Sequence, residues 1–212
     1  MSENEEALKL DPKKTVMIIQ DMQNDVISEG GAFAGDGGAE HAKSQNVVEK
    51  VARLAEAARS AGVPVIHVHY VVDPGAPGLK QNAGLYRAVK EAKALVRGTW
   101  GAAAAEGVEP QEGDIVVEKM RTSAWYNTRL MTLLQGFGTE SVIVSGAWTH
   151  MSIEHTARYG GDAGYDMVVA SDGCSSINDE WHNVGLNYAL TAVGRSATCD
   201  QIAEALGATV KA

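Results

Sequence analysis

Three polar side chains suited to hydrolytic chemistry stand beside short apolar runs of this 212-residue chain: Asp21, Lys119 and Ser152. A carboxylate can take up and return a proton, and a neighbouring ammonium can stabilise a developing anion. A hydroxyl in the first turn of a helix lies among free backbone N–H groups, at the positive end of the helix dipole. Brought together, the three side chains could support nucleophilic attack on a carbonyl carbon.

The elements that must position these side chains alternate along the sequence. Apolar runs rich in β-branched residues predict strands, and apolar residues at helical spacing predict helices. Strands are predicted at 15–20, 63–72, 114–118, 140–145, 166–170 and 196–198, and helices at 46–61, 83–97, 128–134, 152–160, 179–192 and 200–206. Such alternation is typical of βαβ crossovers, so we predict an α/β fold with a mainly parallel sheet covered on both faces.

This fold would bring the three side chains to one edge of the sheet. In open parallel sheets, ligands bind outside the carboxyl ends of the strands. Asp21 closes the first predicted strand, Lys119 follows the third, and Ser152 opens the helix after the fourth. The glycine-rich segment 28–38 predicts an irregular loop beside them.

Composition narrows the partners of the chain. The formal net charge of −9 argues against nucleic acid or an anionic membrane, because both would repel the surface on average. No stretch approaches the ~20 apolar residues of a membrane span, and the polar, acidic N-terminus is unlike a secretory signal. We expect a cytoplasmic protein with a flexible leader over residues 1–14 and a single domain over residues 15–212. Cys174 and Cys199 are predicted to be reduced packing residues.

Three sequence runs reproduce the order of the signatures of a known enzyme family. The first run is DMQND from Asp21, the second is KMRTSAW from Lys119 with Thr128 beyond it, and the third is GAWTHMSIEHTAR from Gly146. Together they resemble the isochorismatase-like (cysteine hydrolase) superfamily. Ser152 stands where that family usually has its catalytic cysteine.

The resemblance implies a fold and a mechanism. It implies a three-layer α/β/α sandwich with a six-stranded, mainly parallel, Rossmann-like sheet. In members with cysteine, the aspartate matching Asp21 takes the thiol proton, and the lysine matching Lys119 stabilises the thiolate that attacks an amide carbonyl. The resemblance also implies a cis peptide bond between Ala147 and Trp148, and an oxyanion hole made by the backbone N–H groups of Trp148 and Ser152.

Serine at position 152 leaves three interpretations open. It is an introduced, inactivating replacement of cysteine, a natural serine that still attacks, or the mark of a branch that needs no nucleophile. We predict a hydrolase, an amidohydrolase that cleaves a C–N bond of a small amide, ureide or carbamoyl compound. The alternatives are vinyl-ether hydrolysis of the isochorismatase type, with Asp21 as the acid, and a non-catalytic binding homologue. Asp73 argues against the vinyl-ether reaction, because it would repel a dicarboxylate.

Four further residues are predicted to contact the substrate: Gln23, Tyr70, Trp125 and His150. For the aromatic side chains, packing is an equally good interpretation. We expect the substrate to be a small molecule and, from the habit of the family, the protein to be a homo-oligomer, either a dimer or a tetramer.

The remaining histidines do not indicate a metal site. His67 and His69 lack a carboxylate at the Asp-x-His spacing of the metal-binding members of this superfamily, so neither a metal nor another cofactor is predicted. His155 and His182 are predicted to lie on helix surfaces.

Overall fold

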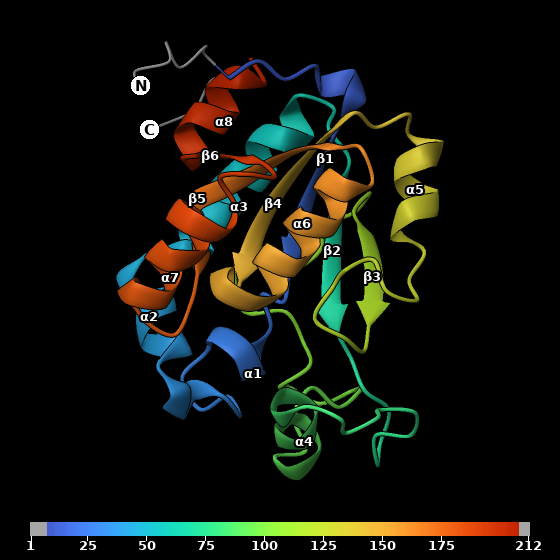
Figure 1. Ribbon diagram of the computed structural model, residues 1–212, viewed down its shortest axis with the longest axis vertical. Coiled ribbons are helices and arrows are strands. Elements are labelled where there is room, and N and C mark those ends of the chain that lie inside the picture. The colour runs from blue at the N-terminus through green and yellow to red at the C-terminus, as the bar shows by residue number, and fades with distance from the viewer. Residues whose placement is uncertain (1–7, 208–212) are drawn as a thin grey trace.

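Six strands form a single sheet in the order β3-β2-β1-β4-β5-β6 (Figure 1). The structure is a computed structural model that describes residues 8–207. The strands are β1 (Thr15–Gln20), β2 (Val65–Tyr70), β3 (Ile115–Lys119), β4 (Ser141–Ala147), β5 (Asp166–Ser175) and β6 (Arg195–Ala197). Every neighbouring pair is parallel, so each connection must cross from one end of the sheet to the other.

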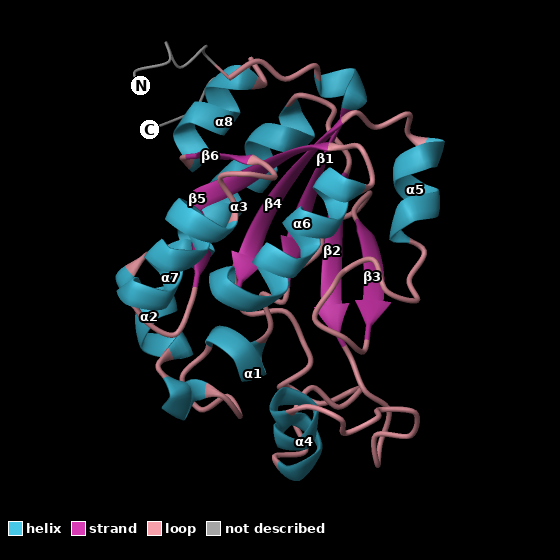
Figure 2. Cartoon of the chain, viewed as in Figure 1, coloured by secondary structure: helices cyan, strands magenta, loops and turns pink. Residues whose placement is uncertain are grey.

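Helices cover both faces of the sheet (Figure 2). The α-helices are α1 (Asn24–Ile27), α2 (Gly38–Ser44), α3 (Val47–Ser60), α4 (Gly84–Glu91), α5 (Leu130–Gly136), α6 (Glu154–Asp162), α7 (Asp179–Val184) and α8 (Cys199–Ala205). Short 3₁₀ turns occupy Pro12–Lys14 and Ala34–Asp36, and π-helical turns occupy Thr149–Ile153 and Gly185–Ala189. The predicted α/β/α sandwich is confirmed. Among residues 8–207, no helix combines the length and apolar character that a membrane crossing needs.

Alternate residues of β1 face two different cores. All six residues of the strand are buried, as expected for the centre of a parallel sheet. Met17 and Ile19 pack in one core with Leu54 of α3. Ile18 packs in the other core with Leu130 of α5. The two-residue period of a strand therefore holds a helix layer on each face, with the sheet between them.

Strand β1 has its predicted bounds, whereas several other elements end elsewhere. The helix predicted at 83–97 ends at Glu91, because Lys93 and Leu95 adopt φ values of 51° and 57° that no α-helix accepts. The segment 28–38, predicted to be irregular, contains a 3₁₀ turn and leads directly into α2.

Part of the predicted N-terminal leader is packed against the domain. Residues 1–7 of that leader lie outside the described residues. Leu10 is buried in the core, and Pro12–Lys14 forms a 3₁₀ turn. Lys14 Nζ lies 2.7 Å from Glu140 Oε1 at the start of β4. The described part of the leader is therefore ordered structure in contact with the sheet.

A long excursion between β2 and β3 lies beyond the carboxyl ends of the strands (Figure 1). It carries α4 and is attached to the domain by backbone hydrogen bonds. The Leu95 N–H donates to Asp25 Oδ2 at 2.6 Å, and the Asp25 N–H donates to the Gly101 carbonyl at 2.9 Å. These bonds place the excursion over the edge of the sheet at which Asp21 and Lys119 stand.

Candidate active site

Asp21 and Lys119 form a buried ion pair at the carboxyl ends of β1 and β3. Lys119 Nζ lies 2.8 Å from Asp21 Oδ2, and the two side chains are 0% and 5% exposed. Strand β2 lies between β1 and β3, so the lysine side chain reaches across the end of β2, where Nζ lies 5.0 Å from the centroid of the Tyr70 ring. Asp21 adopts a φ of 55°, in the left-handed region that non-glycine residues seldom enter outside special sites.

All three N–H donors of the Lys119 ammonium form hydrogen bonds within the protein. Besides Asp21, it donates to the backbone carbonyls of Arg121 and Thr122 at 2.9 and 3.0 Å. A lysine ammonium has three N–H donors. Lys119 therefore fixes Asp21 and the turn after β3, and it offers no further donor to a ligand.

Burial moves both members of the pair toward their neutral forms. Burial raises the pKa of Asp21, and the Lys119 ammonium and the Ser152 hydroxyl counteract this effect only in part. Burial likewise lowers the pKa of Lys119 against the opposing influence of Asp21. Asp21 Oδ1 is buried and finds no hydrogen-bond partner among residues 8–207. A carboxyl group with a raised pKa and a free oxygen suits a general acid–base.

Ser152 stands in the π-helical turn Thr149–Ile153, which joins β4 to α6. The peptide bond between Ala147 and Trp148 is cis. The Ile153 N–H donates to the Trp148 carbonyl at 3.2 Å, whereas the Trp148 N–H has no backbone acceptor among residues 8–207. The helix predicted from position 152 therefore begins as a wider turn, a form that is frequent at functional sites.

Asp21, Tyr70 and Ser152 line one pocket, and all three are buried. Together with the indole nitrogen of Trp148, they supply the polar side-chain atoms of the lining. Neither Tyr70 Oη nor Asp21 Oδ1 has a hydrogen-bond partner in the part of the chain that the structure describes. The other lining residues are apolar or aromatic: Val26, Phe33, Leu85, Val89, Leu95, Ala147, Trp148 and Met151. The pocket thus has a few polar atoms near Asp21, and the rest of its lining is apolar or aromatic.

Gln20, the last residue of β1, ties two turns of the site together. Its Nε2 donates to the carbonyls of Thr122 and Ser152 at 3.1 and 3.2 Å. The side chain is fully buried. Gln20 was not among the predicted site residues. A glutamine that ends an otherwise apolar buried strand could have indicated that its side chain bonds to the backbone of neighbouring turns.

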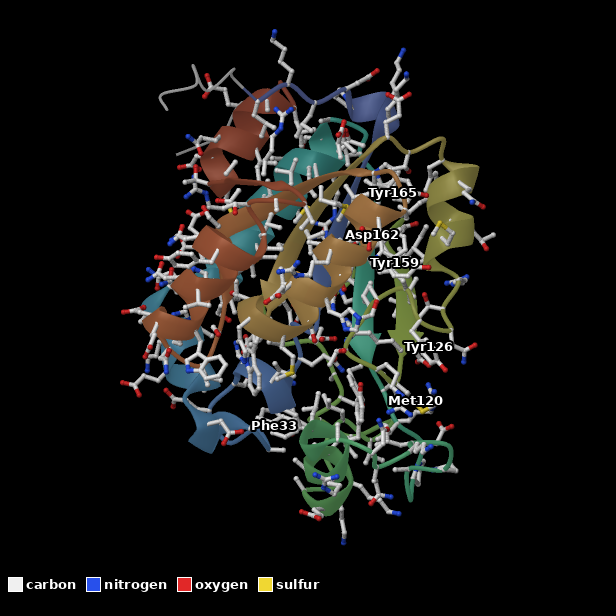
Figure 3. All side chains as sticks on the ribbon, in the orientation of Figure 1. Phe33, Met120, Tyr126, Tyr159, Asp162 and Tyr165 are labelled. Carbon is white, nitrogen blue, oxygen red and sulfur yellow. The ribbon has the colours of Figure 1, made fainter. Side chains whose placement is uncertain are left out.

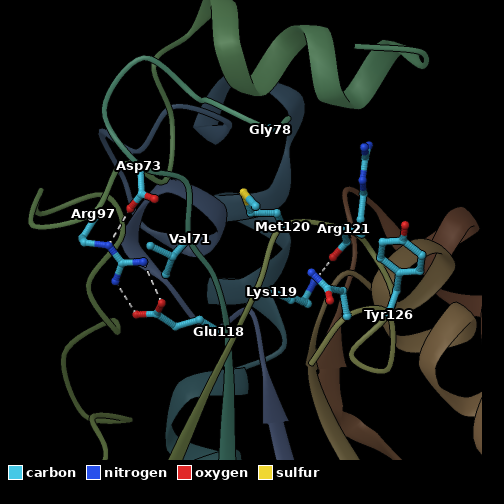
Figure 4. Close-up of a pocket in the computed structure, with 10 residues that line it drawn as sticks. Val71, Asp73, Gly78, Arg97, Glu118, Lys119, Met120, Arg121 and Tyr126 are labelled. Carbon is cyan, nitrogen blue, oxygen red and sulfur yellow. Dashed lines mark hydrogen bonds and ion pairs between the residues drawn. The ribbon is translucent and has the colours of Figure 1, made fainter. Parts of the chain in front are cut away.

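A second pocket lies on the other side of Lys119 and is lined by ion pairs (Figure 4). Arg97 Nε lies 2.7 Å from Asp73 Oδ1, and Arg97 donates to both oxygens of Glu118. Asp73, which was predicted to repel a dicarboxylate, is therefore paired with a cation. It lines this second pocket and not the one that holds Asp21.

The comparison with known proteins identifies the family of the chain. The sequence profile of the isochorismatase domain matches residues 15–201. The chain belongs to the isochorismatase family. It is 32% identical to the ureidoacrylate amidohydrolase RutB of Methylobacterium radiotolerans, over 98% of this chain and 85% of that protein. It is also 30% identical to the uncharacterized isochorismatase family protein YecD of Escherichia coli O157:H7, over 94% of this chain and 100% of that protein.

Solved structures show the same fold. The crystal structure of a cysteine hydrolase from Pseudomonas syringae pv. phaseolicola aligns with a TM-score of 0.82 at 22% identity, over 97% of this chain and 99% of that one. The chain is thus a member of a hydrolase family with the fold of its structural relatives, and its strand ends carry the Asp21–Lys119 pair beside Ser152.

Of the side chains predicted to contact substrate in this isochorismatase-family protein, Gln23 lies outside the pocket lining. Its Nε2 donates to the carbonyls of Tyr70 and Ala102 at 2.9 and 2.8 Å, and its Oε1 accepts from the Tyr70 N–H at 2.7 Å. Gln23 is fully buried. Its amide therefore anchors the excursion to β2 and carries no free polar atom toward a ligand.

Trp125 and His150 also lie outside the lining of this pocket. Trp125 belongs to the core that includes Leu130 of α5 and Ala157 of α6, and its ring stacks on Tyr159 and Tyr165 at centroid distances of 5.4 and 5.6 Å. The two tyrosines are labelled in Figure 3. The ring of His150 stacks on Trp148 and meets Trp181 edge-on at 4.8 Å. Packing is therefore the interpretation that the structure supports for both rings.

The prediction that His182 lies on a helix surface is wrong, whereas His155 is exposed as predicted. His182 Nδ1 lies 2.8 Å from Thr149 Oγ1, which donates to the Ser175 carbonyl at 2.9 Å. The threonine hydroxyl has one proton, so His182 Nδ1 must be the donor to it. His182 thereby holds the first residue of the turn that carries Ser152.

No metal-binding cluster is found in the described part of the chain. No group of three or more His, Cys, Asp or Glu side chains converges there. His67 Nε2 lies 3.0 Å from Asp114 Oδ2, and Arg59 donates to both oxygens of the same carboxylate. This buried cluster joins α3, β2 and the start of β3, and it has the character of a structural ion pair.

Proposed function

We propose that this protein hydrolyses a C–N bond of a small amide, ureide or carbamoyl compound, with Asp21 as general acid–base, Lys119 as its partner and position 152 as the nucleophile. The observation that carries the proposal is the buried Lys119–Asp21 contact of 2.8 Å at the pocket that Ser152 also lines. The similarity to a ureidoacrylate amidohydrolase over nearly the whole chain supports the same reaction class.

The proposed reaction proceeds through an acyl-enzyme. Asp21 takes the hydroxyl proton of Ser152 while Oγ bonds to the carbonyl carbon, and the carbonyl oxygen becomes an oxyanion near the backbone N–H groups of Trp148 and Ser152. Collapse of this intermediate breaks the C–N bond, and Asp21 returns the proton to the leaving nitrogen. Water then attacks the ester, Asp21 takes its proton, and the acid product leaves with Oγ reprotonated.

Serine makes this route slower than cysteine would. A serine hydroxyl is far less acidic than a thiol, and an Asp–Lys pair lacks the imidazole that activates serine in a triad. The vinyl-ether reaction therefore stays a second candidate, favoured by serine itself and by the raised pKa of Asp21, which suits an acid that needs no nucleophile.

Replacing Ser152 separates the two candidates. In amide hydrolysis, Ser152→Cys should raise kcat by several orders of magnitude, because a thiolate forms readily beside Lys119 at the first turn of a helix. Ammonia release from a panel of carboxamides, ureides and carbamoyl compounds measures this gain, and mass spectrometry of the quenched variant should reveal an acyl adduct on the new thiol. Ser152→Ala is the matched control and should be inactive on amides.

The opposite result would select the second candidate. Vinyl-ether hydrolysis does no covalent work at position 152, so Ser152→Cys and Ser152→Ala should both retain the rate of the parent on isochorismate. No gain on any amide, together with that retention, would reject the proposal in favour of the ether hydrolase. Inactivity of all three proteins on both substrate classes would point instead to a non-catalytic binding homologue.

A homo-oligomer is proposed as the working form. An exposed stripe on α7 and the following turn supports it: Trp181, Val184 and Tyr188 are 48%, 49% and 77% exposed and share one helical face. Contiguous exposed apolar side chains are typical of interaction surfaces. Light scattering after size exclusion should give a dimer or a tetramer. A cytoplasmic location stays a prediction from the sequence.

A further inference from the structure

The pocket beside Asp21 has a very small polar inventory. Among residues 8–207, three buried side-chain polar atoms of the lining residues lack a hydrogen-bond partner: Asp21 Oδ1, Tyr70 Oη and Trp148 Nε1. The lining also includes the hydroxyl residue Ser152. Buried polar atoms without partners are rare in folded proteins, and a ligand is one way to supply those partners. Oδ1 can accept one hydrogen bond and Tyr70 Oη can donate one. A group with one N–H and one carbonyl oxygen matches both.

The walls of the pocket consist of carbon from three separate parts of the chain. Leu85 and Val89 come from α4, and Leu95 follows that helix in the excursion. Phe33 lies at the end of the molecule that carries α4 (Figure 3), and its ring meets that of Trp148 at 6.0 Å in a T-shaped contact. Such walls favour a ligand with an apolar body, because its burial removes carbon surface from water.

The cations near the pocket are engaged with other groups, and none of them lines it. Lys119 gives its three donors to Asp21 and to two backbone carbonyls. Arg97 is paired with Asp73 and Glu118 in the second pocket (Figure 4). Arg121 stacks on Tyr86 with its guanidinium 4.2 Å from the ring centroid, donates to the Lys80 carbonyl, and is absent from the lining.

We propose that this pocket takes an uncharged ligand, a short aliphatic carboxamide or alkylurea, and excludes analogues whose apolar end carries a carboxylate. This inference rests on the proposed function for the reaction of the amide or urea group beside Asp21. It adds that the rest of the ligand is apolar and uncharged. A buried carboxylate without a cationic partner is costly, and it would here stand near the carboxylate of Asp21. The ligand thus differs from ureidoacrylate, whose acrylate group is an acid.

Matched ligand pairs test the inference by binding alone. Butyramide and succinamate differ by one methyl group replaced by a carboxylate, and propylurea and 3-ureidopropionate differ in the same way. Thermal shift of the unmodified protein needs no turnover. The neutral member of each pair should reach the same rise in Tm at a concentration at least about tenfold lower, which corresponds to about 1.4 kcal/mol. Tyr70→Phe should weaken binding of both neutral ligands.

A charge placed in the wall should reverse the preference. Leu85→Lys puts an ammonium beside the apolar body, so succinamate should then bind better than butyramide. Leu85→Gln has similar length without the charge and should weaken butyramide binding without reversing the order. Gln81→Lys adds the same charge at an exposed position before α4 and should leave the parent preference unchanged. Arg121→Gln should also leave it unchanged, since Arg121 does not line the pocket.

Three results would overturn the inference. They are equal or tighter binding of the carboxylated ligands to the unmodified protein, no shift with any neutral ligand, and a carboxylate affinity that depends on Arg121. The proposed function fails in a different way. If neutral ligands bind but Ser152→Cys releases ammonia from none of them, the pocket class holds and the reaction is rejected. If Ser152→Cys cleaves 3-ureidopropionate in preference to propylurea, the reaction holds and the pocket class is rejected.

Discussion

Gln20 Nε2 donates to the carbonyl oxygen of Ser152 at 3.2 Å, from the last residue of the central strand to the turn that holds the candidate nucleophile. The same nitrogen donates to Thr122, whose carbonyl also accepts from Lys119. One amide group therefore sets the distance between the nucleophile turn and the turn that holds the lysine. Without this amide, no hydrogen bond from Gln20 would hold the two turns at a fixed distance.

Gln20→Leu should lower both stability and turnover. Leucine has no donor, so the Ser152 carbonyl loses this hydrogen bond, whereas the Thr122 carbonyl keeps the one from Lys119. We expect a total cost of about 1–3 kcal/mol. In the Ser152→Cys background, kcat should fall while KM changes little, because the pocket walls are untouched. Denaturant unfolding and steady-state kinetics measure the two effects.

Ser145→Ala is the matched control for Gln20. It removes the 3.1 Å hydrogen bond from Ser145 Oγ on β4 to the Ile18 carbonyl on β1. This bond is buried, and it involves neither the turn that carries Ser152 nor the turn after β3. Stability should fall and kcat should stay. If Gln20→Leu also left kcat unchanged, its role would be limited to stability.

Asp21→Asn should abolish turnover on amides and on isochorismate, because both candidate mechanisms move a proton through this carboxylate. The fold should persist with a loss on the order of 3 kcal/mol, since the buried Lys119 keeps its two backbone acceptors but loses its counter-ion. Circular dichroism confirms folding and product assays measure activity. Asp36→Asn, which makes the same change at an exposed position, should retain full activity. Near-full activity of Asp21→Asn would mean that the site has been misassigned.

The acid limb of the pH–activity profile should lie above the range of an ordinary aspartate. Burial raises the pKa of Asp21 from 3.8, so its proton-accepting form is lost at a higher pH as the solution is acidified. The profile of kcat/KM for the Ser152→Cys variant reports this group in the free enzyme. A rate that stays constant down to pH values near 4 would contradict a raised pKa.

Gly146→Ala should be strongly destabilising. Gly146 adopts a φ of 121°, and a Cβ there would lie 2.0 Å from the carbonyl oxygen of Gln20 on the neighbouring strand. Neither backbone can move without disturbing the sheet, so we expect a loss above about 3 kcal/mol. Gly136→Ala is the contrast: it lies in α5 with nothing within 4 Å of the added carbon, so it should stabilise by about 0.5–1 kcal/mol. Urea titration of both variants checks the opposite signs.

His182 should make stability depend on pH between its unfolded and folded pKa values. Burial lowers the pKa of His182 from 6.5 to about 4. Between these values the unfolded chain binds more protons, so stability is fully present above the unfolded pKa and is lost as pH falls toward 4. His182→Asn should reduce the loss over this window by an amount on the order of 2 kcal/mol. The exposed His155→Asn should leave the slope unchanged in Tm measurements across the same range.

The placement of Asp21, Lys119 and Ser152 at one edge of the sheet could be predicted, because the end of a strand is recognisable from the neighbouring residues in the sequence. Asp21, Lys119 and Ser152 each follow a readable apolar run, and a parallel sheet brings such ends to one edge. The ion pair and the shared pocket follow from that placement. The role of Gln23 did not follow, because its amide is used by the Tyr70 and Ala102 backbones, and the second of these belongs to the non-local excursion.

The residues of the pocket walls could not be predicted from the sequence for a related reason. Leu85, Val89 and Leu95 reach the site through hydrogen bonds that dock the excursion, such as Leu95 N–H to Asp25 Oδ2. Periodicity reports which face of a helix is apolar, and it does not report which part of the molecule that face meets. Trp125 illustrates the converse, since this aromatic follows Lys119 by six residues in the sequence and yet packs in the core on the other face of the sheet.

The strand order also has a consequence for the time course of folding. β1 lies between β2 and β4, and the register that joins Gln20 to Gly146 spans more than half of the chain. Long sequence separation between contacting strands slows the search for the native arrangement. On the ribosome, the first strand must therefore wait in an incomplete sheet until β4 has been synthesised. The edge of β1 that pairs with β4 therefore stays without its partner strand for as long as the ribosome takes to reach residue 147.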